Sequence, residues 1–222
     1  MLVNVEENSK EDLNDILKSY ETNFIIQEVL KSHIDMLKLN RSSLNTIRVY
    51  SLRVPDSSEI VILGSAVRFG GEDSFRDNAC TGGGFARVND DGFVEDTIYQ
   101  YCSFEKRSLK IEKQLDKFMI PSFHKVKDMC VNMHKMLPYM DLVGWDIAIN
   151  EQAEPVFIEL NQTPDCEFIQ IFNGPMFREY TDAIMERIKG ASIEEKTCYT
   201  RHYNDGPKQY EYTFDISKKL SI

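Results

Sequence analysis

Hydrophobic residues recur at helical spacing in three segments of the chain. Residues 9–20 place leucine, isoleucine and tyrosine on one stripe, after a serine N-cap and with acidic residues in the first turn. Residues 123–137 and 175–189 predict two longer helices, the first closed by Pro138 and the second by Gly190. We therefore expect one helix near the start of the sequence and two in its second half.

Shorter apolar runs, bounded by turn residues, predict strands. These runs cover residues 24–30, 46–54, 60–69, 85–88, 93–101, 142–150 and 155–161. Polar turns at residues 55–58 and 89–92 join neighbouring runs closely enough to form antiparallel hairpins. Antiparallel hairpins with a helix covering one face indicate an α+β fold built on one sheet.

The composition is that of a globular protein and excludes some classes of function. The 222 residues carry a net charge of −10, which argues against a nucleic-acid partner. The five cysteines are widely spaced and form no C-x-x-C pair, so neither a zinc site nor a disulfide framework is indicated. Since we find no signal peptide and no apolar run near the ~20 residues of a membrane helix, we expect a cytoplasmic protein without membrane insertion.

The last predicted hairpin brings two acidic residues together. If residues 151–154 form its loop, Asn150 faces Pro155 and Asp146 lies directly opposite Glu159. Two opposed carboxylates repel each other unless a cation lies between them or one of them takes up a proton. The pairing therefore predicts either a cation site or an exposed hairpin face whose acids meet water.

A third oxygen donor favours the cation site. Asn161 lies two residues beyond Glu159, so it shares a face of the sheet with Glu159 and Asp146. Two carboxylates and an amide oxygen form a set of hard ligands that suits Mg²⁺ with bound phosphates. The polar exit at residues 161–165 is typical of a functional loop. By contrast, His124 and His134 on the helix at 123–137 have no acidic partner in sequence reach, and we interpret both as structural.

Several of these segments together resemble the ATP-grasp superfamily. Residues 158–165 (IELNQTPD) resemble its metal motif, in which a strand ending in Glu-x-Asn follows a strand that supplies an aspartate. The patterns NTIR at residues 45–48 and GWDIA at 144–148 are similar to those of sugar-transfer-associated ATP-grasp proteins. The resemblance covers roughly residues 24–189. It implies an ATP-grasp-like antiparallel sheet with flanking helices.

The resemblance also implies roles for residues upstream of the hairpin. Arg48 and Arg68 would contact the nucleotide phosphates or an acyl-phosphate intermediate, and Asn78 would be a further ligand to the active centre. Both arginines stand at even positions of two antiparallel strands, so they can share a face, and guanidinium groups suit phosphate oxygens. The alternative is that both are surface arginines paired with acidic residues.

A hinge segment that binds adenine is implied near the start of the chain. The backbone of Glu28 and Leu30 would contact the edge of the base, Gln27 its amino group, and His33 the ribose. Asp146, Glu159 and Asn161 would bind Mg²⁺. Without the resemblance, the hinge segment would be interpreted as an ordinary buried strand.

The implied function is that of an ATP- and Mg²⁺-dependent carboxylate ligase that forms an acyl phosphate and passes the acyl group to an amine or sugar acceptor. The implied domains are a helical remnant at 1–23, the ATP-grasp domain at 24–192 and a tail at 193–222, with the N-terminal lobe largely missing. If these residues are the whole product, we expect weak nucleotide affinity. The alternatives are a non-catalytic nucleotide-binding or scaffold module and a magnesium-dependent phosphohydrolase.

Overall fold

The computed structural model describes residues 10–20, 28–71, 83–100, 118–190, 200–205 and 208–213. Its helices are α1 (Lys10–Ser19), α2 (Phe123–Lys135), α3 (Cys166–Asn173) and α4 (Thr181–Gly190), with 3₁₀ turns η1 (Met36–Lys38) and η3 (Arg178–Tyr180). Its strands are β1 (Ile47–Arg53), β2 (Ile60–Phe69), β3 (Gly84–Val88), β4 (Val94–Gln100), β5 (Leu142–Ile149), β6 (Pro155–Asn161), β7 (Thr200–Asp205) and β8 (Lys208–Thr213). None of the described helices is long and apolar enough to cross a lipid bilayer.

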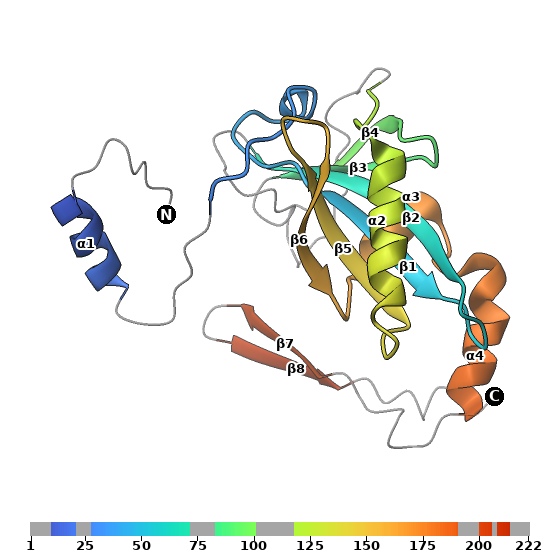
Figure 1. Ribbon diagram of the computed structural model, residues 1–222. Coiled ribbons are helices and arrows are strands. Elements are labelled where there is room, and N and C mark those ends of the chain that lie inside the picture. Colours follow the sequence, from blue (N-terminus) through green and yellow to red (C-terminus); the bar gives the residue numbers. More distant parts are fainter. Residues whose placement is uncertain are drawn as a thin grey trace.

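A six-stranded sheet in the order β4-β3-β2-β1-β5-β6 organises the structure (Figure 1). All of its neighbouring strands pair antiparallel. Together with the flanking helices, this confirms the predicted α+β class and the ATP-grasp-like sheet. The central strands β1 and β5 are far apart in sequence, yet they pair directly and form the middle of the site described below.

Helix α2 covers one face of the sheet (Figure 1). Its Val126 and Cys130 pack with Val49 of β1 and with Trp145 of β5 in one buried cluster. Val49 and Trp145 lie on the same face of the sheet as the other odd-numbered residues of their strands, because side chains alternate between the two faces of a strand. Burial of this apolar face is the main contribution to the stability of the sheet.

A buried polar chain, here called the histidine network, links α2 to the same face. It consists of Ser51 in β1, His134 in α2 and Trp145 in β5. The indole Nε1 of Trp145 donates to the Ser51 hydroxyl at 2.7 Å, and that hydroxyl lies 2.7 Å from Nδ1 of His134. Nε2 of His134 lies 3.0 Å from the carbonyl oxygen of Met140. A carbonyl can only accept, so Nε2 carries the proton and Nδ1 accepts from the hydroxyl.

Among the described residues, α3 and the segment that leads into α4 cover one end of the opposite face of β1. Tyr50 and Leu52 pack there with Ile169 of α3 and with Met176. The neighbouring even-numbered position towards the start of β1 is Arg48, which carries charge. The charged side chains therefore gather on this face beside the start of β1.

The structure corrects the predicted helices of the second half. Helix α3 was not predicted, although Asp165 is its N-cap and accepts a hydrogen bond from the backbone N–H of Glu167 at 3.0 Å. The helix expected at 175–189 begins only at Thr181, because Arg178 has a left-handed φ of 43° and residues before Thr181 form a 3₁₀ turn. A regular helix cannot run through a left-handed residue.

Two further predictions are corrected at the ends of the chain. Residues 28–30 form no strand, whereas the rest of the strand expected at 24–30 lies outside the described residues. The predicted tail at 193–222 contains the hairpin of β7 and β8, whose strands pair from Thr200 opposite Thr213 to Asp205 opposite Lys208. No strand is predicted there from the sequence, because polar and aromatic residues follow each other without a clear hydrophobic period.

Candidate active site

Arg48 and Asp146 form the centre of the charged face. They are directly opposite each other in the pairing of β1 with β5. Nε of Arg48 donates to Oδ1 of Asp146 at 2.5 Å, and Nη2 donates to Oδ2 at 2.9 Å. This two-point contact is the strongest geometry available to a guanidinium and a carboxylate. The side chains are only 14% and 4% exposed, so water screens the pair little.

Arg68 reaches the same carboxylate from the end of β2. Its backbone N–H donates to the carbonyl oxygen of Thr46 at 2.8 Å, which holds it beside the start of β1. Its Nη1 donates to Oδ2 of Asp146 at 3.1 Å. The expectation that Arg48 and Arg68 share one face is thus confirmed. We call Arg48, Arg68 and Asp146 the arginine–aspartate cluster.

The two arginines determine the ionisation of Asp146. Burial by itself would raise the pKa of this carboxyl, because the charged form loses its hydration. The hydrogen bonds and positive charge of Arg48, together with the charge of Arg68, overcome that effect and hold the pKa of Asp146 below its usual range. Asp146 is therefore a carboxylate at neutral pH.

Glu159 lies opposite Asp146 as predicted, but by a different register from the one expected. Near the loop the pairs are Ile149 with Pro155 and Ile147 with Phe157, so Asn150 does not face Pro155. A bulge in β6 then adds Ile158 as an extra residue, and the next pair is Asp146 with Glu159. A bulge reverses the side-chain alternation of its strand.

The bulge separates two odd-numbered residues of β6 onto opposite faces. The ring of Phe157 meets Trp145 at a centroid distance of 6.3 Å on the α2 side. Glu159 instead meets Asp146, and a hydrogen bond between the two carboxyl groups raises the pKa of Glu159 above its usual value. Burial and the negative charge of Asp146 act in the same direction. Ile158 is 40% exposed at the edge of the sheet.

Asn161 completes the predicted set at the end of β6. It is the cross-strand partner of Gly144, two residues from Asp146, so it stands on the charged face. Its Nδ2 atom is buried and has no hydrogen-bond partner among the residues that the structure describes. A buried, unsatisfied amide costs about 1–3 kcal/mol. An unsatisfied buried donor of this kind is expected in a side chain that binds a ligand.

These residues fit a divalent cation by the chemistry of their donors. Two carboxyl groups on opposed residues and the amide oxygen of Asn161 on the same face are hard oxygen ligands of the type that Mg²⁺ prefers. Across the described part of the chain, no group of three or more His, Cys, Asp and Glu side chains is placed to hold a metal. A site here thus depends on the amide of Asn161 as its third donor.

Tyr50 and Asp165 support this region and were not singled out from the sequence. The hydroxyl of Tyr50 donates to the carbonyl oxygen of Asp165 at 2.8 Å, which ties β1 to the turn after Asn161. Burial raises the pKa of Tyr50 to about 12, so the hydroxyl remains a donor at neutral pH. Tyr50 follows Arg48 at the next position on the same face, and that spacing is the signal that could have identified it.

Gly144 is required by the same turn. A Cβ atom at this position would lie 2.7 Å from Cβ of Pro164, closer than carbon atoms approach without displacement. The turn at residues 161–165 therefore packs directly onto the backbone of β5. This explains in steric terms why glycine stands two residues before Asp146.

The predicted hinge residues lie away from the cluster. The backbone N–H of His33 donates to the carbonyl oxygen of Ile149 at 2.9 Å, which is roughly 10 Å along β5 from Asp146. Glu28 is exposed and Leu30 half-buried in the segment that leads to His33. The other two predicted site residues, Gln27 and Asn78, lie outside the described residues.

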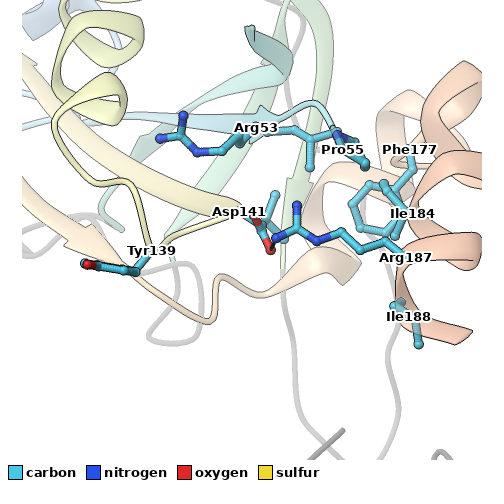
Figure 2. A pocket seen from close by; sticks show the side chains of 10 residues that line it. Arg53, Pro55, Tyr139, Asp141, Phe177, Ile184, Arg187 and Ile188 are labelled. Atoms are coloured by element: carbon cyan, nitrogen blue, oxygen red, sulfur yellow. Dashed lines mark ion pairs between the residues drawn. The ribbon is translucent and has the colours of Figure 1, made fainter. Parts of the chain in front are cut away.

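The structure also contains a pocket of about 690 Å³ that includes none of the predicted site residues (Figure 2). It lies between the ends of β1 and β5 and helix α4, where Leu142 and Ile184 contribute to its wall. Arg187 of α4 points across it to Asp141, with Nη2 and Oδ2 3.2 Å apart (Figure 2). Leu142 is roughly 13 Å along β5 from Asp146, so this pocket and the charged face are separate features.

The charged face lies within a segment of the chain that matches a known protein family. A family model described as sugar-transfer associated ATP-grasp matches residues 9–186. The chain belongs to this family. No curated protein matches it.

Membership in the sugar-transfer associated ATP-grasp family agrees with the resemblance seen in the sequence. It identifies the chain as an ATP- and nucleotide-binding protein with an ATP-dependent, ligase-like function related to sugar transfer. The matched segment contains every residue of the arginine–aspartate cluster as well as Glu159 and Asn161. The roles of these individual residues are considered next.

Proposed function

We propose that this protein is an ATP- and Mg²⁺-dependent carboxylate ligase whose active centre is the charged face of β1, β5 and β6. The observation that carries the proposal is the convergence of Arg48 and Arg68 on Asp146, with the carboxyl group of Glu159 beside it. Positive and negative groups at such close quarters suit a ligand that contains both a cation and phosphates. The family match supports a nucleotide as that ligand.

In this proposal the ligase reaction has two steps. A carboxylate oxygen of the substrate attacks the γ-phosphorus of ATP, the bond to the β,γ-bridging oxygen breaks, and ADP leaves. An amine or hydroxyl of the acceptor then attacks the acyl carbon, inorganic phosphate leaves, and the acceptor loses its proton. Neither step needs a nucleophilic side chain, because positioning and charge stabilisation account for most catalysis of phosphoryl transfer.

The roles of the side chains follow from their charges. Arg48 and Arg68 would hold the transferred phosphoryl group and the acyl phosphate, and Asn78 would be a further ligand. Asp146, Glu159 and Asn161 would hold the metal, which when bound supplies positive charge to the phosphate oxygens. The guanidinium group of Arg48 remains charged, because the hydrogen bond and charge of Asp146 raise its pKa although burial alone would lower it.

The nucleotide base would lie towards the other end of β5. Gln27, Glu28 and Leu30 would contact adenine and His33 the ribose. The bond from His33 to the end of β5 supports this, since the segment then lies along the same strand as the metal ligands. The acceptor in this proposal is a sugar or a cell-surface polysaccharide precursor, in keeping with the description of the family.

Magnesium-dependent nucleotide binding tests the proposal. Isothermal titration calorimetry would measure the affinity for the β,γ-imido analogue of ATP, with and without Mg²⁺, in the wild type and in Glu159→Gln. We expect Mg²⁺ to strengthen binding in the wild type and expect the variant to lose at least about tenfold in affinity.

Glu154→Gln is the matched control, because Glu154 belongs to the same hairpin but pairs with Lys125, at 2.7 Å, and not with Asp146. It should bind as the wild type does. Equal affinity of Glu159→Gln and the wild type would refute the assigned metal site. Binding without any release of ADP from ATP would favour the non-catalytic alternative.

A further inference from the structure

The pocket between helix α4 and the ends of β1 and β5 combines an apolar wall with a charged rim (Figure 2). Its volume of about 690 Å³ lies within the roughly 300–1,000 Å³ that is typical of small-molecule sites. The apolar wall consists of Leu52, Pro55, Leu142, Phe177, Ile184 and Ile188. Because Ile184 and Ile188 are four residues apart in the sequence, they form one stripe of α4 along the pocket. This wall suits a ligand with apolar surface to bury.

The charged residues of the pocket have an excess of positive charge. Two arginines, Arg53 and Arg187, line it together with Asp141, which leaves an excess of one positive charge in a chain whose net charge is −10. Among the side chains that the structure describes, Arg53 pairs with no acidic group. Its Nη2 donates to the carbonyl oxygens of His134 and Leu137 at 2.9 and 3.2 Å. Carbonyl groups at a helix end offset a full positive charge only in part, so the pocket favours a negatively charged ligand.

Arg187 is well placed to bind the negative group of such a ligand. It extends from α4 across the pocket towards Asp141, and its Nη2 lies 3.2 Å from Oδ2 (Figure 2). Both side chains are about half exposed, at 49% and 50%, so water weakens their ion pair. A guanidinium has five N–H groups, and Arg187 can therefore donate to a ligand while it stays beside Asp141. The negative charge of Asp141 then opposes the binding of an anion.

We propose that this pocket binds a small amphiphilic anion, whose negative head contacts Arg187 and whose apolar body lies against Ile184, Ile188 and the end of β1. A straight-chain carboxylate is the simplest member of this class. The pocket is separate from the charged face of β1, β5 and β6. It would give the chain a second ligand site, which does not depend on the function proposed above.

A titration with octanoate, followed by two-dimensional NMR of ¹⁵N-labelled protein, tests the proposal. The amide signals that shift should belong to α4 and to the ends of β1 and β5. From butanoate to octanoate, the affinity should rise about threefold for each methylene group, as expected for a hydrocarbon chain that leaves water. Octanamide has nearly the same shape without the charge, and it should bind at least about tenfold more weakly than octanoate.

Two substitutions at the rim should change the affinity for octanoate in opposite directions. Arg187→Gln removes the charged donor and should weaken binding about tenfold, whereas Asp141→Asn removes the opposing charge and should strengthen binding about threefold. A general folding defect would weaken binding in both variants, which would count against the proposal. Arg87→Gln is the matched control, because Arg87 also pairs with a carboxyl group, Glu95 at 2.8 Å, but lies in β3 away from the pocket. It should leave the affinity unchanged.

The remaining outcomes decide against the proposal. Octanamide that binds as tightly as octanoate would show that the pocket does not select for negative charge. Shifted signals confined to the charged face would place the ligand at the wrong site. Absence of octanoate binding in a protein that still binds the nucleotide would overturn this second site alone and leave the function proposed above standing.

Discussion

Two buried polar groups occupy opposite faces of the same two strands, and they differ in kind. On the α2 face, the histidine network joins Ser51, His134 and Trp145 through neutral hydrogen bonds of 2.7 Å. On the other face, the arginine–aspartate cluster joins charged groups. Beside it, the pKa of Glu159 is raised, and Nδ2 of Asn161 is buried without a hydrogen-bond partner among the described residues. Both include one residue of β1 and one of β5, to which α2 adds His134 on one face and β2 adds Arg68 on the other.

The difference shows which polar cluster is complete within the protein. In the histidine network each donor has one acceptor, from the indole to the hydroxyl, to the imidazole and to the carbonyl oxygen of Met140. On the charged face the pKa of Glu159 is raised, that of Asp146 is lowered, and the buried amide nitrogen of Asn161 has no hydrogen-bond partner within the described part of the chain. A network that satisfies itself holds elements together, whereas one with unused capacity is suited to a ligand.

Removing the charge of Asp146 should have the largest effect on stability. In Asp146→Asn the guanidinium groups of Arg48 and Arg68 stay buried without their counter-charge, and breaking a buried ion pair typically costs 3–5 kcal/mol. We expect the free energy of unfolding, measured by urea denaturation, to fall by about 4 kcal/mol. Binding of the metal–nucleotide complex should be lost as well.

Asp141→Asn provides the control for this change. Asp141 also pairs with an arginine, Arg187, but both side chains are about half exposed, at 50% and 49%. Its substitution should cost no more than about 1 kcal/mol. Similar losses of unfolding free energy in Asp146→Asn and Asp141→Asn would show that burial does not make the ion pairs of Asp146 contribute more to stability than the exposed pair of Asp141.

Removing the imidazole of His134 should affect stability but not binding. In His134→Ala the Ser51 hydroxyl and the Met140 carbonyl oxygen each lose a partner, and a cavity is left between α2 and the sheet. The expected loss in free energy of unfolding is about 3 kcal/mol. Nucleotide affinity, measured at a temperature where the variant is folded, should stay within about twofold of the wild type.

His124→Ala is the reference for that loss, because His124 lies on the exposed side of the same helix. It should change stability by less than about 0.5 kcal/mol. A large decrease in nucleotide affinity in His134→Ala would break the distinction between the two faces.

Parts of the charged face could be predicted from the sequence because they depend on short-range pattern. Arg48 and Arg68 stand at even positions of one hairpin, and Asp146 pairs with Glu159 across another. The two arginines share a face because a register shift beside Tyr50 leaves Leu63 unpaired, so that Arg48 pairs with Ala66. The second prediction succeeded with an incorrect register near the loop. The extra residue Ile158 shifts the register of β6 by one, and this shift places Glu159 opposite Asp146. The sequence around Ile158 carries no signal of a bulge.

What could not be predicted depends on contacts between distant segments. The bond between Arg48 and Asp146 requires β1 to lie beside β5, and the strand order of a sheet does not follow from the pattern of any one strand. Helix α3 was predictable in principle, since Asp165 followed by Glu167 is an N-terminal helix signal. We do not predict α3 from the sequence, because we interpret Asp165 as part of the polar exit at residues 161–165.

The pH dependence of stability gives the finest test of the comparison, since it measures whether His134 is neutral in the folded protein. Burial lowers the pKa of His134; Arg53 acts in the same direction, while the Met140 carbonyl and Asp141 oppose it. A lowered pKa means that the unfolded state takes up the proton first as pH falls through about 6.5. The stabilisation by His134 is therefore complete above that pH and decreases below it.

The difference in unfolding free energy between the wild type and His134→Ala should narrow by about 1 kcal/mol from pH 7 to pH 5.5, measured by urea denaturation at both values. A gap that stays constant would mean that His134 titrates equally in the folded and unfolded states, and the network would then not be the closed, neutral one described here.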